Sequence, residues 1–246
     1  MAALGEGRYE VEVETVEVRG TDGELIPAIH ARPDGMPRCG VVLHPDIGGL
    51  RPLFEDLVRR LATHGAAVCS PEPFARALAS GVDLSDPNQR MAYVAHLEDE
   101  LQLGDLEAAG DYLVVNDDVS DVAVLGFCMG GMYALKAAAT GRFDRAVSFY
   151  GMVRVLEGWR SPTLAEPLAS IDAACPTLAI FGGSDPYTPA ADIEALRQAW
   201  AARSDCEIVV YPEADHGFVH DADRDAHRAD DAADAWSRVF KFLDLD

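Results

Sequence analysis

The chain has 246 residues, of which 49% are hydrophobic and 25% charged, proportions that fit a globular protein with a sizeable core. Its 42 acidic residues outnumber 20 basic ones, and a net charge of −22 argues against nucleic acid and anionic membranes as partners. Because the sequence has neither a signal-like start nor an apolar run near the roughly 20 residues of a membrane helix, we expect one cytoplasmic domain, residues 1–246.

The first half of the chain alternates short apolar runs with one clear amphipathic helix. The strands expected here cover residues 9–18, 25–31, 40–43 and 66–69. Residues 52–64 have apolar side chains at helical spacing, and residues 75–89 are predicted to be a loop. Residues 88–115 follow a helical period, with a possible break at Gly104 because glycine is a weak helix former.

The second half repeats the alternation of strand and helix. Strands are expected at residues 122–125, 146–150, 177–181 and 207–211, and helices at 129–139, 190–202 and 229–243. Residues 152–171 look irregular. This pattern predicts an α/β protein with a mainly parallel, doubly wound sheet and helices on both faces.

A nucleophile elbow is the most informative motif. Residues 126–130 read Gly-Phe-Cys-Met-Gly, which fits the G-x-S-x-G pattern with cysteine in place of serine. A strand that turns directly into a helix holds Cys128 at the tip of the turn, in a strained conformation that the flanking glycines make sterically possible. The adjacent helix N-terminus favours the thiolate.

Other polar residues follow the remaining strands, where the sites of open α/β sheets gather. Asp185 follows strand 177–181 and His216 follows strand 207–211, so the chain order is nucleophile, acid, histidine. His216 would take the thiol proton, and Asp185 would fix the histidine tautomer. The backbone N–H groups of Ile47 and Met129 are the expected oxyanion hole.

Simpler interpretations exist for each of these residues. Cys128 alone would usually be a buried structural cysteine, and Asp185 alone could form an Asx turn. His216 and His220, four residues apart, would suit a metal only on a helix, whereas Asp215-His216-Gly217 is typical of a loop. We therefore expect no metal. The cysteines are odd in number and form no CxxC pair, which indicates reduced thiols; they are Cys39, Cys69, Cys128, Cys175 and Cys206.

From residue 41 to 243 the chain resembles the dienelactone hydrolase (carboxymethylenebutenolidase) family. The motifs that carry the resemblance are HPDIGG (44–49), PFAR (73–76), GDLEAA (104–109), GFCMGG (126–131), GGSD (182–185) and EADHGF (213–218). The resemblance implies the α/β-hydrolase fold and a cofactor-free hydrolase that opens a lactone through an acyl-cysteine. It also places the triad on Cys128, Asp185 and His216.

Two departures from the family pattern concern substrate binding. Asp46 stands where the family has a glutamate that interacts with the resting thiol, and His220 stands where it has an arginine that holds the substrate carboxylate. The family's other substrate arginine is retained as Arg76. Because histidine is mostly neutral at pH 7, we expect a different lactone or a less charged ester as substrate.

Two other functional classes were weighed. An amidotransferase-like protein would carry its histidine before its acid, often as His-x-Glu, whereas here Asp185 precedes His216. A hydrolase-fold protein that binds a small molecule without turnover is the second alternative, and substitution of Cys128 would separate it from an enzyme. The expected partner is a small lactone or ester, and the expected assembly is a monomer or small homo-oligomer.

Overall fold

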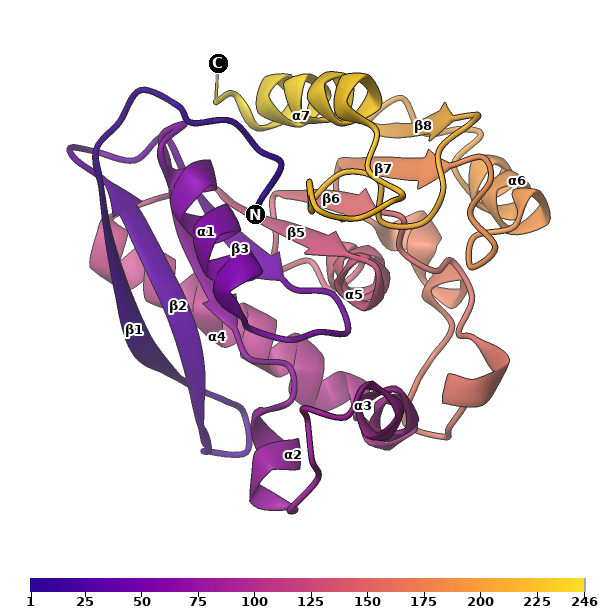
Figure 1. Ribbon diagram of the computed structural model, residues 1–246, viewed down its shortest axis with the longest axis horizontal. Coiled ribbons are helices and arrows are strands. Elements are labelled where there is room, and N and C mark those ends of the chain that lie inside the picture. The colour runs from indigo at the N-terminus through magenta and orange to yellow at the C-terminus, as the bar shows by residue number, and fades with distance from the viewer. Residues whose placement is uncertain (246) are drawn as a thin grey trace.

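The computed structural model describes residues 1–245, leaving aside the side chains of residues 78 and 79. Within residues 1–245, eight strands form one sheet in the order β1-β2-β4-β3-β5-β6-β7-β8 (Figure 1). The strands are β1 (Val11–Arg19), β2 (Leu25–Pro33), β3 (Cys39–His44), β4 (Ala66–Pro71), β5 (Val122–Phe127), β6 (Arg145–Phe149), β7 (Thr177–Gly182) and β8 (Cys206–Tyr211). Strand β2 pairs antiparallel with β1 and β4, and all other neighbours are parallel.

Helices cover both faces of this sheet and enclose two apolar layers. The helices are α1 (Pro52–Ala62), α2 (Ala75–Ala79), α3 (Pro87–Tyr93), α4 (Asp99–Asp117), α5 (Met129–Ala138), α6 (Ala190–Ala199) and α7 (Ala229–Leu243). Helices α1 and α7 bury Leu57 and Trp236 against one face, and α4, α5 and α6 bury Leu113, Met132 and Leu196 against the other. The predicted α/β architecture is confirmed. No helix within the described residues is long and apolar enough to cross a membrane.

The buried strands carry the site, whereas the hairpin at one edge faces solvent. Every residue of β3, β4, β5 and β7 is buried, as expected for parallel strands that helices cover on both sides. Strand β1 instead consists of exposed and partly buried residues, apart from the buried Val18. The carboxyl ends of β3, β5, β6, β7 and β8 therefore meet at one rigid edge of the sheet.

The segment between β4 and β5 differs from the sequence-based prediction. Residues 75–89, predicted to be a loop, contain α2 and the first residues of α3. Helix α3 begins with a local signal, since the Asp86 side chain accepts a hydrogen bond from the Asn88 N–H and Pro87 occupies the first helical turn. A short 3-10 turn, η1 (Val94–His96), follows α3.

The predicted helix break at Gly104 is also wrong, because the break lies earlier. Leu97 and Glu98 are extended, and α4 then runs without interruption through Gly104. A Cβ atom at residue 104 would lie 2.6 Å from the Thr21 Cγ2 atom in the β1–β2 turn. Glycine is therefore needed here for close packing of α4 on the hairpin. Residues 152–171 are irregular, as predicted, with short turns η2 (Glu157–Trp159) and η3 (Pro167–Ala169) and the start of η4 (Ile171–Ala173).

Candidate active site

Cys128 occupies the turn between β5 and α5, with φ 58° and ψ −116°. These angles lie in a region that non-glycine residues rarely adopt, and such strain persists only where the surroundings fix it. Here the Cys128 N–H donates to the Phe149 carbonyl at 3.0 Å, and the Cys128 carbonyl accepts from Met132 N–H at 3.0 Å. The backbone on both sides thus holds the sulfur at the tip of the elbow.

The flanking glycines make this turn sterically possible. A Cβ atom on Gly126 would lie 2.0 Å from the Gly130 carbonyl oxygen, and one on Gly130 would lie 2.2 Å from the His44 carbonyl oxygen. Both contacts are with backbone atoms, which cannot move aside as a side chain could. The elbow pattern found in the sequence therefore has a direct packing cause.

The structure places Asp185 and His216 beside the elbow. The His216 Nδ1 atom lies 2.7 Å from the Asp185 Oδ2 atom, and the other Asp185 oxygen accepts from the Tyr187 N–H at 2.8 Å. Asp185 follows β7 and His216 lies in the loop after β8, so two strand ends supply the pair. Cys128 and His216 line the same pocket, and the Cys128 side chain acts to raise the pKa of the imidazole. All three predicted triad residues are therefore together.

His216 is surrounded by groups that favour its charged form. Burial of the ring acts to lower its pKa, but hydrogen bonds to Asp185 and Cys128 outweigh burial and raise the pKa to about 9. The rings of Tyr150 and Tyr187 approach the imidazole edge to face, with centroids 5.0 and 4.9 Å away. An imidazolium paired with a thiolate is the arrangement that activates a cysteine nucleophile.

Two backbone N–H groups are free to form the predicted oxyanion hole. Ile47 lines the pocket around Cys128, and Met129 is the first residue of α5. Within residues 1–245, neither N–H donates a hydrogen bond to a protein acceptor. Unpaired N–H groups beside a nucleophile can stabilise the oxyanion of an acyl-transfer intermediate.

The pocket over Cys128 is small and mostly apolar, with a volume of about 200 Å³. Its lining includes the polar groups Asp46, His216 and His220. The apolar part of the wall includes Met91, Met152, Leu156, Trp159 and Tyr187. The Trp159 indole N–H donates to the Met91 sulfur at 3.2 Å and so joins α3 to the irregular segment. Such a wall suits an apolar acyl or leaving group.

Asp46 and His220 line this pocket, but they contact each other. The His220 Nε2 atom lies 3.0 Å from the Asp46 Oδ2 atom, and Arg51 holds the same carboxylate in a bidentate contact at 2.6 and 2.8 Å. Burial acts to raise the pKa of Asp46, but these bonds dominate and hold the pKa well below its usual range. Burial lowers the pKa of His220, which is therefore neutral.

Arg76 is engaged elsewhere. Its guanidinium contacts Asp105 at 2.6 Å and Asp22 at 2.7 Å, and it is not among the residues that line the Cys128 pocket. These bonds tie α2 to α4 and to the β1–β2 turn. The structure thus does not bring this predicted substrate-binding residue to the other site residues.

Three further residues at the site were not predicted. Tyr150 directly follows β6, and its position at a strand end was the signal that could have identified it. Arg51 lies five residues after Asp46 and has no distinguishing pattern. Arg224 is exposed at the rim of the pocket, and within residues 1–245 its guanidinium forms no ion pair. Its position depends on the fold of a long acidic loop.

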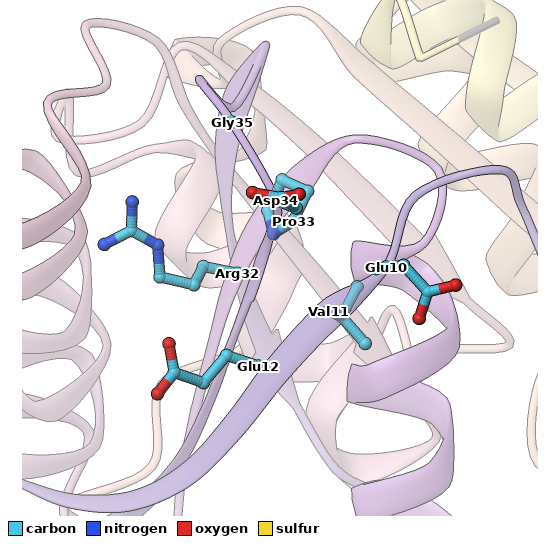
Figure 2. A pocket seen from close by; sticks show the side chains of 7 residues that line it. All are labelled: Glu10, Val11, Glu12, Arg32, Pro33, Asp34 and Gly35. Atoms are coloured by element: carbon cyan, nitrogen blue, oxygen red, sulfur yellow. The ribbon is translucent and has the colours of Figure 1, made fainter.

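A larger hollow, about 350 Å³, lies at the β1–β2 hairpin far from this chemistry (Figure 2). Its lining includes Glu10, Glu12, Arg32 and Asp34, and Figure 2 shows Glu12 and Arg32 extending to the same side of the hairpin. None of the residues that line it is a cysteine, serine or histidine. We therefore assign the chemistry to the smaller pocket.

The described residues contain no group of three or more histidine, cysteine, aspartate or glutamate side chains arranged to hold a metal. His216 lies in a loop and is followed by Gly217 at φ 78°, so it does not share a helical face with His220. His227 bonds to the Phe218 carbonyl. All five cysteines are free thiols.

Several known proteins are similar to this chain over most of its length. A model described as the dienelactone hydrolase family matches residues 26–245. A protein named "Putative carboxymethylenebutenolidase" from Escherichia coli K12 is 34% identical over 230 residues, which are 91% of this chain and 83% of that protein. The carboxymethylenebutenolidase of Rhodococcus opacus is 30% identical over 95% of this chain and 91% of its own length.

A solved structure is also similar over nearly its whole length. It is described as a putative dienelactone hydrolase from Klebsiella pneumoniae subsp. pneumoniae, and it superimposes with a TM-score of 0.85 at 30% identity. The match covers 96% of this chain and 99% of that one. The fold around Cys128 is thus the α/β-hydrolase fold.

Proposed function

Because the chain belongs to the dienelactone hydrolase family, we propose that it hydrolyses a lactone or small carboxylic ester through an acyl-cysteine intermediate on Cys128. The continuous sheet supports a single catalytic domain over residues 1–246. Five free thiols support a reducing compartment, the cytoplasm, as its location.

In the acylation step, the Cys128 thiolate attacks the carbonyl carbon of the substrate. The N–H groups of Ile47 and Met129 receive the oxyanion, and a donor in this position typically contributes on the order of 3 kcal/mol to transition-state stabilisation. The His216 imidazolium then gives its proton to the leaving oxygen, which departs as an alcohol or, from a lactone, stays attached to the opened chain.

In the deacylation step, the neutral His216 removes a proton from water, and the resulting hydroxide attacks the thioester. The carboxylic acid is released, and the thiolate returns to Cys128. Asp185 keeps His216 in the correct tautomer throughout and stabilises its charged form. The observation that carries this proposal is the His216 ring, which contacts Asp185 at 2.7 Å and lines the same pocket as Cys128.

The pocket favours a substrate with little charge near its carbonyl group. His220 is neutral and bonded to Asp46, and Arg76 is bonded to two aspartates, so neither offers a cation to the substrate. The apolar part of the pocket wall suits an alkyl or aromatic body. Among the described residues that line the pocket, Arg224 alone carries a guanidinium, and an anionic tail of a substrate could reach it.

The proposal is tested with a panel of lactones and p-nitrophenyl esters, both neutral and carboxylated. Turnover is measured, and the quenched protein is mapped by mass spectrometry for an acyl group on Cys128. We expect turnover, an adduct on Cys128 and preference for neutral substrates. A C128A variant should form no adduct and should lose turnover.

Two results would contradict the proposal. Turnover that persists in C128A would place the nucleophile elsewhere. Ligand binding without any turnover or adduct in the native protein would favour the alternative function, a small-molecule binder.

A further inference from the structure

A second hydrogen-bonded chain lies beside the triad, and acyl transfer does not use it directly. The Tyr150 hydroxyl bonds to the His220 Nδ1 atom, and the His220 Nε2 atom lies 3.0 Å from the Asp46 carboxylate. Tyr150 and His220 are at most 1% exposed, and Asp46 is 5% exposed. Tyr150 also has a positive φ of 39°, unusual for a bulky residue. Its surroundings must therefore hold it firmly.

The direction of each hydrogen bond in this chain follows from the chemistry of its members. Asp46 is ionised, since its pKa is held low, and a carboxylate only accepts hydrogen bonds. The neutral His220 must therefore carry its single proton on Nε2. Nδ1 is left as an acceptor, and the Tyr150 hydroxyl, whose pKa burial raises, donates to it.

The Asp46 carboxylate organises the loop that contains Ile47. Its Oδ1 atom accepts from the Gly48 N–H at 2.7 Å and from Arg51 at 2.6 Å. The Asp46 carbonyl accepts from the Gly49 N–H at 3.0 Å. Ile47 lies between these anchor points, so the direction of its N–H depends on where the Asp46 side chain is held.

His220 connects this loop to the loop that carries the catalytic histidine. The bonds from Gly48, Gly49 and Arg51 are internal to residues 46–51 and cannot fix the segment relative to His216. The donor from His220 comes from residues 212–228, the same loop as His216. Among the described residues, no other hydrogen bond joins residues 45–51 to that loop.

We propose that His220 is a positioning residue that fixes the Ile47 N–H relative to His216 and Cys128, by donating from Nε2 to Asp46. This inference rests on the proposed function, because it assigns the Ile47 N–H to the oxyanion. Since the oxyanion exists only after attack, loss of this bond affects the chemical step and leaves substrate binding nearly unchanged.

Two amide substitutions separate the two nitrogen atoms of His220. In H220Q the amide nitrogen can occupy the Nε2 position and still donate to Asp46. In H220N the shorter side chain can keep an acceptor near the Nδ1 position for Tyr150, but it no longer reaches Asp46. The variants are similar in polarity and remove the same ring, so each is the control of the other.

For H220N we expect kcat to fall by about 10- to 100-fold, short of the roughly 100- to 1000-fold cost of removing an oxyanion donor outright. KM should stay within about threefold, and H220Q should keep kcat within about threefold of the native value. Alkylation of Cys128 by iodoacetamide requires the thiolate but no oxyanion hole. Its rate should be unchanged in both variants.

Hydrogen–deuterium exchange of the peptide covering residues 45–51 supplies a readout that needs no turnover. Exchange should rise in H220N and stay native-like in H220Q. The inference is overturned if H220N leaves both kcat and exchange unchanged, if it raises KM alone, or if both variants fail equally. Native protein without esterase activity would instead refute the proposed function, and the exchange data would still decide the role of His220.

Discussion

His216 and His220 lie in one loop, are both buried and both contact an aspartate, yet they carry different charges. Burial acts to lower the pKa of His216, but the hydrogen bond to Asp185 and the nearby Cys128 side chain raise it to about 9. Burial lowers the pKa of His220, and Arg51, which is paired with Asp46, acts in the same direction; the hydrogen bond to Asp46 does not offset them.

The comparison teaches that a neighbouring carboxylate does not by itself set the charge of a histidine. What decides is the balance between burial of the ring, which favours the neutral form, and the charged groups around it. His220 is 1% exposed and His216 is 9% exposed, so burial weighs more heavily on His220. In the proposed mechanism the charged His216 is the acid and base, and the neutral His220 is a positioning residue. Four predictions test this difference between His216 and His220 and the groups around them.

The largest difference should appear when the two aspartates are changed in parallel. D185N removes the charge that supports the His216 imidazolium, and kcat should fall roughly 10⁴-fold. D46N should only shift the position of the Ile47 N–H, so kcat should fall by nearer 100-fold. Steady-state kinetics on one ester measure both. Equal losses would show that the two aspartates do not have different roles.

Removal of Arg51 should make His220 resemble His216. In R51M the Asp46 carboxylate loses its cation, so the pKa of His220 should rise, because Arg51 acts to lower it. Loss of the partly exposed ion pair between Arg51 and Asp46 should also lower the free energy of unfolding by about 1–2 kcal/mol. Histidine titration by NMR and urea denaturation measure these effects. R51K should retain the charge with a smaller loss of stability.

The two histidines should give opposite pH dependence to stability. The pKa of His216 is raised from 6.5 to about 9, so its contribution is complete below pH 6.5 and is lost as the pH rises through 9. We expect this loss to be roughly 1–3 kcal/mol. The pKa of His220 is lowered, so its contribution is lost as the pH falls below 6.5.

Urea denaturation across pH 5–10 measures how the free energy of unfolding changes with pH. H216Q should remove the decline on the alkaline side, and H220Q should remove the decline on the acid side. If the free energy of unfolding of a variant still declined as in the native protein, although the corresponding histidine is missing, the assignment of that decline to the histidine would be wrong.

The smallest effect should come from the exposed guanidinium at the rim. R224M should raise KM for a carboxylated ester about two- to fivefold and leave a neutral ester unchanged, since an exposed charge contributes little and salt screens it. R76M should affect stability but not this preference, because Arg76 is bonded to Asp22 and Asp105. A larger effect of R76M on the carboxylated ester would restore the substrate role predicted for Arg76.

The sequence was sufficient to predict which side chains meet where they lie at strand ends. Cys128, Asp185 and His216 each come after a parallel strand, and parallel strands bring such residues to one edge whatever the loops do. Gly104 shows where helix propensity misleads. Its low propensity predicted a helix break, but its backbone is helical, and glycine is needed there because Thr21 of a distant turn packs against it. Arg76 shows a second limit, since a motif does not reveal which carboxylates the fold brings to it.

The direct test of the account is the protonation of the two histidines, measured by NMR of protein with ¹⁵N-labelled histidine at pH 7.5. We predict that His216 carries protons on both nitrogens and that His220 is neutral with its proton on Nε2. Exchange of His216 for glutamine and of His220 for glutamine assigns the signals. A neutral His216, or a His220 that is charged or protonated on Nδ1, would contradict the account.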